Sequence, residues 1–278
     1  MRPARGISLV CAAFLVARAL AAAPSGADKP DPRTWIIPEF SLSATELRST
    51  TAGLPAEIQD KIMARPVDFM KLLREVLDEP EIYLLLVDKT HPLPASYVPP
   101  DLVRLSDFSL AVSQADLELR RSIMPEVVEM AKAAQGDGVR LLFSSTYRSY
   151  AYQRVVYDRE VQMYGKEMAD RESAVPGRSQ HQLGTAIDFG SITDAFAGTS
   201  EARWLSAHAW EYGFSLSYPQ GYEALTGYRW ESWHYRYITK PGARMQREYF
   251  DDVQQYLLLF LHDERPTLLA HREQSDHP

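Results

Sequence analysis

Residues 176–188 read PGRSQHQLGTAID, and residues 231–235 read ESWHY. The first stretch contributes His181 and, seven residues later, Asp188. The second contributes His234. Two imidazoles and one carboxylate are a sufficient ligand set for a catalytic zinc ion, because such a site keeps its fourth position open for water. These two stretches therefore predict the centre around which the rest of the chain folds.

The three candidate ligands are useful only if the fold brings them together. We expect His181 to lie in a loop, Asp188 on the strand that follows, and His234 on a second strand. Gly184, between the first two, permits a close approach of the backbone. A histidine and an aspartate at this spacing are more often structural when they stand alone. The interpretation therefore depends on the residues around them.

Glu231 stands three residues before His234, where a general base would be useful. Zinc lowers the pKa of bound water from about 15.7 toward about 7. Glu231 would accept the proton of that water and later donate it to the leaving amine. A glutamate at this place argues against a module that only binds zinc and a peptide. A purely structural zinc site would usually have four protein ligands, and only three are visible.

The start of the chain has the pattern of an export signal. Its first residues, MRPARG, are basic, and residues 7–17 form an apolar run that small residues follow. This run is too short to be a comfortable transmembrane helix, so we predict a cleavable signal peptide over residues 1–23. The mature protein would be periplasmic, held at the cell envelope or secreted, with no transmembrane segment. Cys11 is the only cysteine, which excludes a thiol nucleophile or thiolate zinc site from the mature chain.

The charge excludes another class of partner. The formal net charge is −7, and removal of Arg2, Arg5 and Arg18 with the signal gives −7 − 3 = −10. A chain this acidic has no general affinity for nucleic acid. The sequence does not indicate an oligomeric state.

Helical and strand-like patterns are intermixed along the 278 residues. Residues 24–34 are rich in Pro, Asp and Gly and predict a tether. Ser43 and Glu46 have the spacing of a capping box. Apolar spacing over residues 43–78 predicts two short helices that are separated near Pro66.

Further helices are predicted over residues 123–134, 150–164, 201–212 and 245–260. Strands are predicted over residues 82–87, 139–144, 185–189, 214–218 and 228–238. Residues 165–178 have the composition of a polar loop. Because these elements lack the regular rhythm of βαβ units, we predict an α+β fold with a small, mainly antiparallel sheet and flanking helices.

Four stretches together carry a resemblance to a known family. These are residues 144–153 (SSTYRSYAYQ), 176–188, 204–219 (WLSAHAWEYGFSLSYP) and 231–237 (ESWHYRY). In this order they resemble the VanY-type D-alanyl-D-alanine carboxypeptidases. That family belongs to a wider group of zinc peptidases, which includes lysostaphin-like enzymes and the hedgehog N-domain. The resemblance runs from about residue 82 to residue 238.

The resemblance implies that His181, Asp188 and His234 bind one zinc ion per chain and that Glu231 is the catalytic base. It also implies that Arg148 points into the site and holds a substrate carboxylate or the tetrahedral oxyanion. A guanidinium fork is suited to that task. The alternative for this arginine is an ordinary ion pair at the surface.

The same resemblance implies that Gln153 and Ser179 contact the substrate. On physical grounds alone they could be an exposed helix residue and a loop cap. Three positions depart from the family, where Gln180, Ser232 and His208 replace the usual Glu, Pro and Asn. None of these is a predicted ligand, so the departures bear on substrate preference rather than on catalysis.

The implied domains are a tether and helical N-terminal extension over residues 24–80, a single zinc carboxypeptidase domain over residues 81–265 that ends in a helix, and a flexible tail over residues 266–278. The implied activity is removal of the terminal D-Ala from peptidoglycan stem peptides, through attack of zinc-bound water on the peptide carbonyl. An L,D-carboxypeptidase acting on tetrapeptide stems is the nearest alternative, because it uses the same site architecture. A non-catalytic zinc module that binds a peptide or partner protein is a more distant one.

Overall fold

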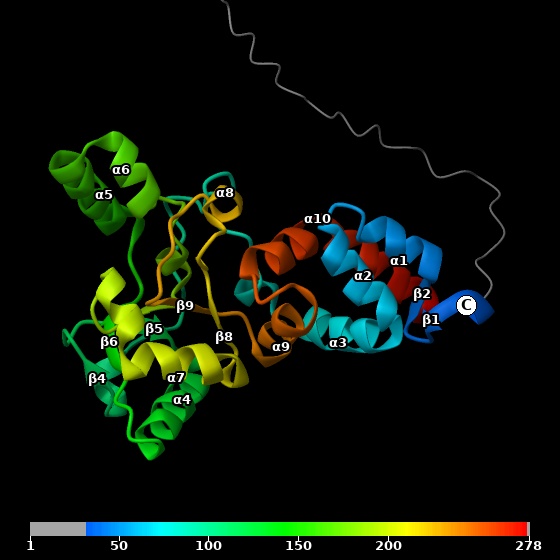
Figure 1. Cartoon of the computed structure of the whole chain (residues 1–278), viewed down its shortest axis with the longest axis horizontal. Coiled ribbons are helices and arrows are strands. Elements are labelled where there is room, and N and C mark those ends of the chain that lie inside the picture. The colour runs from blue at the N-terminus through cyan, green and yellow to red at the C-terminus, as the bar shows by residue number, and fades with distance from the viewer. Residues whose placement is uncertain (1–31, 277–278) are drawn as a thin grey trace, which may run out of the picture. The chain divides into compact units, whose positions relative to one another are not determined.

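A computed structural model describes residues 32–276 (Figure 1). The predicted signal peptide, and the predicted tether as far as residue 31, lie outside the described residues. The α-helices are α1 (Ala44–Thr50), α2 (Ala56–Ala64), α3 (Pro66–Asp78), α4 (Met124–Gly136), α5 (Tyr150–Tyr164), α6 (Lys166–Glu172), α7 (Ser200–His208), α8 (Glu223–Thr226), α9 (Lys240–Tyr249) and α10 (Gln254–Asp276). The strands are β1 (Trp35–Ile37), β2 (Phe40–Ser43), β3 (Leu102–Arg104), β4 (Ala111–Val112), β5 (Glu118–Arg120), β6 (Leu142–Ser145), β7 (Ala186–Phe189), β8 (Phe214–Leu216) and β9 (His234–Tyr237).

The central sheet has the strand order β4-β6-β7-β9-β8. Only β4 and β6 pair in parallel, and the other three pairings are antiparallel. Two further two-stranded sheets, β1-β2 and β3-β5, are also antiparallel. The predicted α+β class with a small, mainly antiparallel sheet is therefore confirmed. Within the described part of the chain, no helix is both long enough and apolar enough to cross a membrane.

One hydrophobic core lies under the central sheet. Helices α4 and α7 contribute Val127, Met130 and Leu205, which pack against strand residues such as Phe143 and Phe189. The two phenylalanine rings lie 5.1 Å apart between centroids, on neighbouring strands. This core gives β6 and β7 a rigid support, on which the residues at their ends are positioned.

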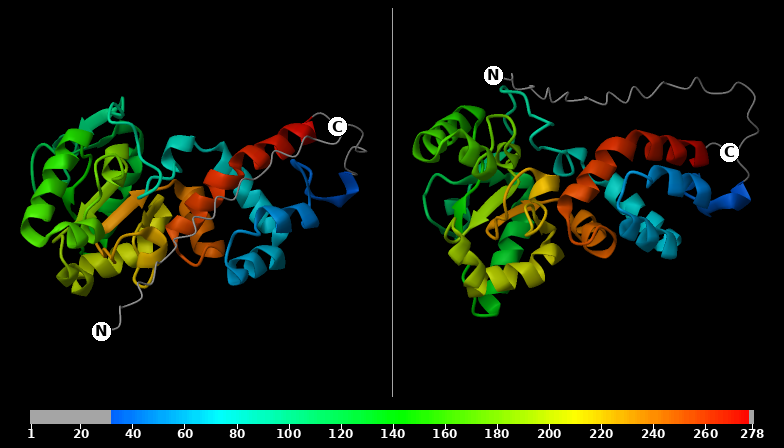
Figure 2. Two further views of the ribbon diagram at one scale, coloured as in Figure 1. Left: turned by 90° about the horizontal axis from the view of Figure 1, so that it is seen from above. Right: turned by 45° about the horizontal axis from the view of Figure 1, so that its top comes forward.

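A second core joins the two ends of the described chain. Phe69 of α3 packs edge-on against Tyr249 of α9 at 5.1 Å and against Phe260 of α10 at 6.1 Å, centroid to centroid. Both views of Figure 2 show α10 running beside the N-terminal helices. The helical extension and the C-terminal helices therefore share one core, which the sequence did not indicate.

The N-terminal helices begin and end largely where the sequence predicts. Ser43 caps α1, and its side chain and that of Glu46 form the predicted capping box. The predicted break near Pro66 is also present, because α2 ends at Ala64 and Pro66 is the first residue of α3. An additional break before α2 makes three helices where we predicted two.

The strand predicted over residues 82–87 is wrong. This segment is a short 3-10 turn (Glu81–Tyr83) followed by irregular chain. Its backbone carbonyls bind a side chain instead of a neighbouring strand, since Nη2 of the buried Arg236 donates to the oxygens of Tyr83 at 3.1 Å and Leu85 at 2.7 Å. The apolar run reflects burial in the core and not sheet pairing.

Two other segments are more helical than predicted. The polar loop expected over residues 165–178 contains α6, where Lys166 and Asp170 pair one turn apart at 2.5 Å. The tail expected to be flexible from residue 266 is helical as far as Asp276. It docks on β2 and the turn before it, where Ser41 Oγ donates to the His271 carbonyl at 2.8 Å and Ser275 Oγ to that of Glu39 at 2.9 Å.

The predicted helix over residues 245–260 is interrupted. Helix α9 ends at Tyr249, and α10 begins at Gln254. Between them Asp251 and Asp252 have positive φ angles of 55° and 59°, which a continuous right-handed helix does not allow. The turn lets α10 change direction and run beside α1–α3.

Asp88 ties the loop after the 3-10 turn to α10. One carboxylate oxygen accepts from the backbone nitrogens of Thr90 at 2.8 Å and His91 at 3.0 Å, and the other accepts from Gln255 Nε2 at 2.8 Å. Burial raises the pKa of Asp88, but these hydrogen bonds outweigh burial and hold the pKa below its ordinary value. The ionised side chain therefore stabilises the fold.

We expect Phe69→Ala to lower the free energy of unfolding by about 3–5 kcal/mol, because it removes a fully buried ring from the core that joins the two chain ends. Urea denaturation measures this change. Val67→Ala on the same helix is the matched control, because Val67 is 41% exposed and its truncation should cost little. A loss below about 1 kcal/mol for Phe69→Ala would contradict the shared core.

We expect Asp88→Asn to lower the free energy of unfolding at pH 7 by about 1–3 kcal/mol. A carboxylate with a depressed pKa stabilises the fold above its unfolded pKa of about 3.9 and loses that contribution as the pH falls through the folded pKa. The difference between variant and wild type should therefore shrink below about pH 4. Urea denaturation at several pH values tests this, and a difference that does not depend on pH would refute it.

Candidate metal centre

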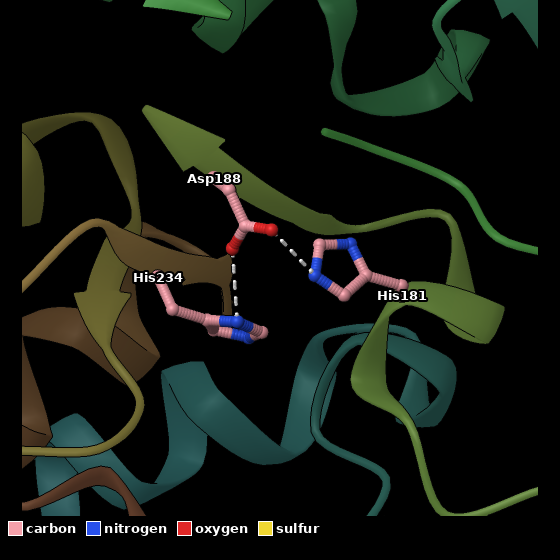
Figure 3. A group of neighbouring side chains, drawn as sticks. All are labelled: His181, Asp188 and His234. Carbon is pink, nitrogen blue, oxygen red and sulfur yellow. Dashed lines mark ion pairs between the residues drawn. The ribbon is translucent and has the colours of Figure 1, made fainter. Parts of the chain in front are cut away.

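His181, Asp188 and His234 converge from three neighbouring elements (Figure 3). His181 lies in a 3-10 turn, Gln180–Leu183, while Asp188 is on β7 and His234 on β9. The antiparallel register of β7 and β9 sets Asp188 directly opposite His234. One ligand atom from each of the three lies within 4.8 Å of the others, and all three residues are buried. The predicted arrangement of loop, strand and second strand is confirmed.

The turn that carries His181 is held in place by its neighbours. Ser179 caps it, accepting a hydrogen bond from the His181 backbone nitrogen at 3.3 Å. Gly184 ends it with a φ of 70°, and a Cβ atom there would lie 3.1 Å from Pro99 Cγ. Arg120 Nε donates to the Leu183 carbonyl at 2.9 Å. Side chains therefore crowd Gly184, and its positive φ favours glycine at this position.

The donor atoms fit a metal ion. Nδ1 of His181 donates to the Thr146 carbonyl at 2.6 Å, which leaves the Nε2 lone pair facing Asp188 Oδ2 at 3.2 Å. Two acceptors this close need a cation or a proton between them. The other carboxylate oxygen, Oδ1, lies 3.1 Å from Nδ1 of His234, but the contact lacks hydrogen-bond geometry, so this buried oxygen has no hydrogen-bond partner among the described residues.

The electrostatics of the cluster are strongly coupled. Burial raises the pKa of Asp188, but the imidazoles of His181 and His234 outweigh burial and hold the pKa well below its ordinary value. Burial lowers the pKa of His234, but Asp188 and Glu231 outweigh it and raise the pKa to about 9. Because a histidine ligand must be neutral, a metal ion at this site would have to displace that proton.

Glu231 lies beside the cluster, with Oε2 at 3.3 Å from His234 Nδ1. It is 8% exposed, and its backbone nitrogen donates to the Tyr218 carbonyl at 3.1 Å. Burial raises the pKa of Glu231 above its ordinary value, and its contact with His234 offsets only part of that rise. A carboxylate whose pKa is raised accepts a proton more readily than an ordinary glutamate does, which suits a general base.

Arg148 also points toward the cluster. Its Nη2 donates to Ser145 Oγ at 2.9 Å and lies 3.9 Å from Asp188 Oδ2. Its Nη1 donates to Gln153 Oε1 at 2.9 Å. Arg148 is therefore not an isolated surface arginine, and its guanidinium group is oriented by two polar side chains.

Gln153 and Ser179 have different places in the site. Gln153 is buried behind Arg148 and also donates to the Ala174 carbonyl at 2.7 Å. Ser179 lines the cavity in front of the cluster, and it also caps the turn before His181. The structure thus gives Gln153 the position of a residue that orients Arg148, and only Ser179 faces the space where a ligand would bind.

The cluster opens into a cavity of about 640 Å³. Its inner end holds Arg148, Glu231 and the three clustered side chains. Its other walls come from α5, α6 and the loops beside β7, β8 and β9. The remaining lining residues are Val156, Glu160, Tyr164, Met168, Glu172, Ser173, Ala174, Ser179, Ile192, Tyr218, Tyr228, Arg229 and Trp233.

Several neighbours of the cluster were not predicted. The Tyr218 ring packs against the His234 ring at 4.8 Å between centroids, and Gln180 Oε1 lies 3.3 Å from His234 Nε2. The Ser217 hydroxyl donates to the same oxygen of Gln180 at 2.7 Å. All three residues belong to the stretches that carry the resemblance, which was the only signal available for them.

Comparison with known proteins identifies relatives with a common activity. Residues 116–240 match the VanY family model, described as D-alanyl-D-alanine carboxypeptidase. The putative carboxypeptidase YodJ of Bacillus subtilis is 35% identical over 193 residues, which cover 64% of this chain and 71% of that protein. A D-alanyl-D-alanine carboxypeptidase of Enterococcus faecalis is 33% identical over 179 residues, which cover 61% of this chain but only 63% of that protein.

The chain is also similar to solved structures of peptidases. A mutant of the vancomycin resistance D,D-pentapeptidase VanY in complex with Zn(II) has a TM-score of 0.55 at 30% identity, covering 64% of this chain and 99% of that one. VanYB in complex with D-alanine-D-alanine has a TM-score of 0.54 at 30% identity, with 64% and 97% coverage. The LD-carboxypeptidase LdcB has a TM-score of 0.54 at 34% identity, with 60% and 85% coverage.

We expect the purified chain to bind one zinc ion, and we expect His181→Ala to abolish stoichiometric binding. Loss of a residue that merely orients a metal ligand costs about 10–100-fold in affinity, so loss of a ligand should cost more. Elemental mass spectrometry after equilibration with limiting zinc measures the metal content. His208→Ala is the matched control, because His208 pairs with Glu211 at 3.0 Å and lies outside the cluster. Equal zinc contents in the two variants would rule out the assignment of this ligand.

Proposed function

The chain belongs to the VanY family of D-alanyl-D-alanine carboxypeptidases, and we propose that it removes the terminal D-Ala from peptidoglycan stem peptides that end in D-Ala-D-Ala. It is a hydrolase of the peptidase class, zinc-dependent like its family. The observation that carries the proposal is the buried His181, Asp188 and His234 beside Glu231, at the inner end of a cavity large enough for a peptide.

His181, Asp188 and His234 would hold one zinc ion. When bound, the ion supplies Lewis acidity, which makes water a nucleophile near neutral pH and polarises the scissile carbonyl. The unsatisfied Oδ1 of Asp188 and the lone pair of His181 Nε2 support this assignment. Thr146 keeps the His181 ring in the required tautomer, since its carbonyl accepts the Nδ1 proton.

The other residues of the site have distinct roles in the proposed reaction. Glu231 accepts a proton from the attacking water, and the new C–O bond forms as that proton leaves. The proton then passes from Glu231 to the amide nitrogen of the terminal residue while the C–N bond breaks, which releases D-Ala as an amine. Arg148 binds the terminal carboxylate or the developing oxyanion through its guanidinium group, which Gln153 and Ser145 orient.

Two further expectations remain proposals. An L,D-carboxypeptidase acting on tetrapeptide stems is the alternative activity, and the similarity to LdcB favours it. The peptidoglycan substrate requires action at the cell envelope, so we also propose that residues 1–23 direct export and that the mature enzyme works outside the cytoplasm.

Incubation of the zinc-loaded protein with pentapeptide and tetrapeptide stems, followed by mass spectrometry, tests the activity. We expect loss of one alanine from the pentapeptide only. Loss from the tetrapeptide alone would move the specificity to L,D, and no change in either peptide would remove the carboxypeptidase proposal.

We expect Glu231→Gln to reduce kcat by about 10²–10⁴-fold, the usual contribution of a general acid–base residue, while zinc content stays unchanged. Steady-state kinetics and elemental analysis measure the two quantities. Glu167→Gln, an exposed glutamate on α6, is the matched control and should keep wild-type kcat. Full activity in Glu231→Gln would refute the assigned role.

A further inference from the structure

The outer part of the cavity wall is one face of α5. Val156, Glu160 and Tyr164 follow each other at intervals of four residues, so they form a single stripe along the helix. All three line the cavity. Gln153, which binds Arg148, precedes them on the same helix. The stripe therefore leads from the catalytic end of the cavity outward.

Among the described residues, Glu160 is the carboxylate on this wall that has no positively charged partner. The other acidic wall residue outside the metal centre, Glu172, pairs with Arg229 Nε at 2.9 Å. Arg229 in turn pairs with Asp194 at 2.7 Å. Among residues 32–276, Glu160 makes no ion pair, although it is partly buried against the cavity.

Exposed apolar side chains line the same cavity as Glu160. Tyr164 is 59% exposed, Met168 of α6 is 40% exposed, and Ile192 is 48% exposed. Large apolar side chains this exposed are available to cover an aliphatic chain. Helices α5 and α6 pack side by side (Figure 1), so Tyr164 and Met168 lie on one hairpin. The outer cavity therefore offers apolar surface and one uncompensated negative charge.

The distance along α5 indicates which part of a peptide would reach Glu160. Glu160 lies seven positions after Gln153, which corresponds to about 10 Å along a helix. An extended peptide covers about 10 Å in three residues. With its terminal carboxylate at Arg148, a bound peptide would place the side chain of its third residue from the C-terminus near Glu160.

We propose that Glu160, with Tyr164, Met168 and Ile192, forms a subsite for a long aliphatic side chain that ends in a free ammonium group, on the residue two before the C-terminal D-Ala. The subsite rests on the proposed function, because that function sets where the peptide terminus binds. In a five-residue stem this is the third residue, and a diamino acid there has the required side chain.

The subsite has a consequence for substrate choice. Cross-linking through the side-chain amine converts an ammonium into a neutral amide, which cannot form a charge-assisted hydrogen bond with Glu160. The enzyme would therefore select stems whose side-chain amine is still free. Glu160 determines specificity in this reaction and takes no part in proton transfer.

Calorimetry on the zinc-loaded Glu231→Ala protein tests the subsite without hydrolysis. The ligands are two pentapeptide stems ending in D-Ala-D-Ala, one with lysine at the third position and one with Nε-acetyl-lysine. We expect the lysine peptide to bind about tenfold more tightly, as one charge-assisted hydrogen bond provides. Adding Glu160→Gln should bring the ratio of the two affinities close to one.

Asp158→Asn in the same background is the matched control, because Asp158 is exposed on α5 outside the cavity lining. It should keep the tenfold ratio. An unchanged ratio in Glu160→Gln, or no preference before that substitution, would overturn the subsite. Hydrolysis by the wild-type chain is measured separately. If the lysine preference depends on Glu160 while hydrolysis is absent, the subsite stands and the proposed function fails.

Discussion

The pairing of β7 with β9 is the constraint on which the site depends. It places Asp188 opposite His234 across two hydrogen-bonded strands, with both side chains on the same face of the sheet. A shift of one residue in this register would turn one of them to the opposite face. The core under the sheet prevents that shift, because Phe189 and Tyr235 alternate with the site residues and are buried on the other face.

The polar atoms around His234 connect the site to the far end of the chain. Gln180 lies between the His234 ring and Ser217, and Gln254, at the start of α10, lies 3.5 Å from Gln180 and donates to the Ser215 carbonyl at 3.3 Å. The next residue, Gln255, binds Asp88. The first turn of α10 thus closes the polar layer behind the candidate metal centre, while the rest of that helix completes the core of the N-terminal extension.

Two charged groups are buried on this face of the sheet, Asp188 on β7 and Arg236 on β9. Asp188 stays ionised because imidazoles surround it, and it stabilises whatever cation joins them. Arg236 is fully buried, and burial lowers its pKa to about 10, while backbone carbonyls at residues 83 and 85 accept from one of its nitrogens. That use of the carbonyls explains why an apolar segment with strand-like composition does not join the sheet.

The amino-acid sequence alone was enough to predict the α+β class, which the structure confirms. It also predicted that His181, Asp188 and His234 bind metal and that Glu231 is the general base, because the motifs around these residues are contiguous in the chain. It also predicted that His181 would lie in a loop and Asp188 on a strand, since Gly184 and the short apolar run after it are local signals. Only the tertiary structure decided that Gln153 lies behind Arg148 and that Glu160 faces the cavity. Those placements depend on contacts of α5 with other segments, such as the hydrogen bond from Gln153 to the Ala174 carbonyl. Contacts between residues distant in the chain leave no mark in the spacing of either one.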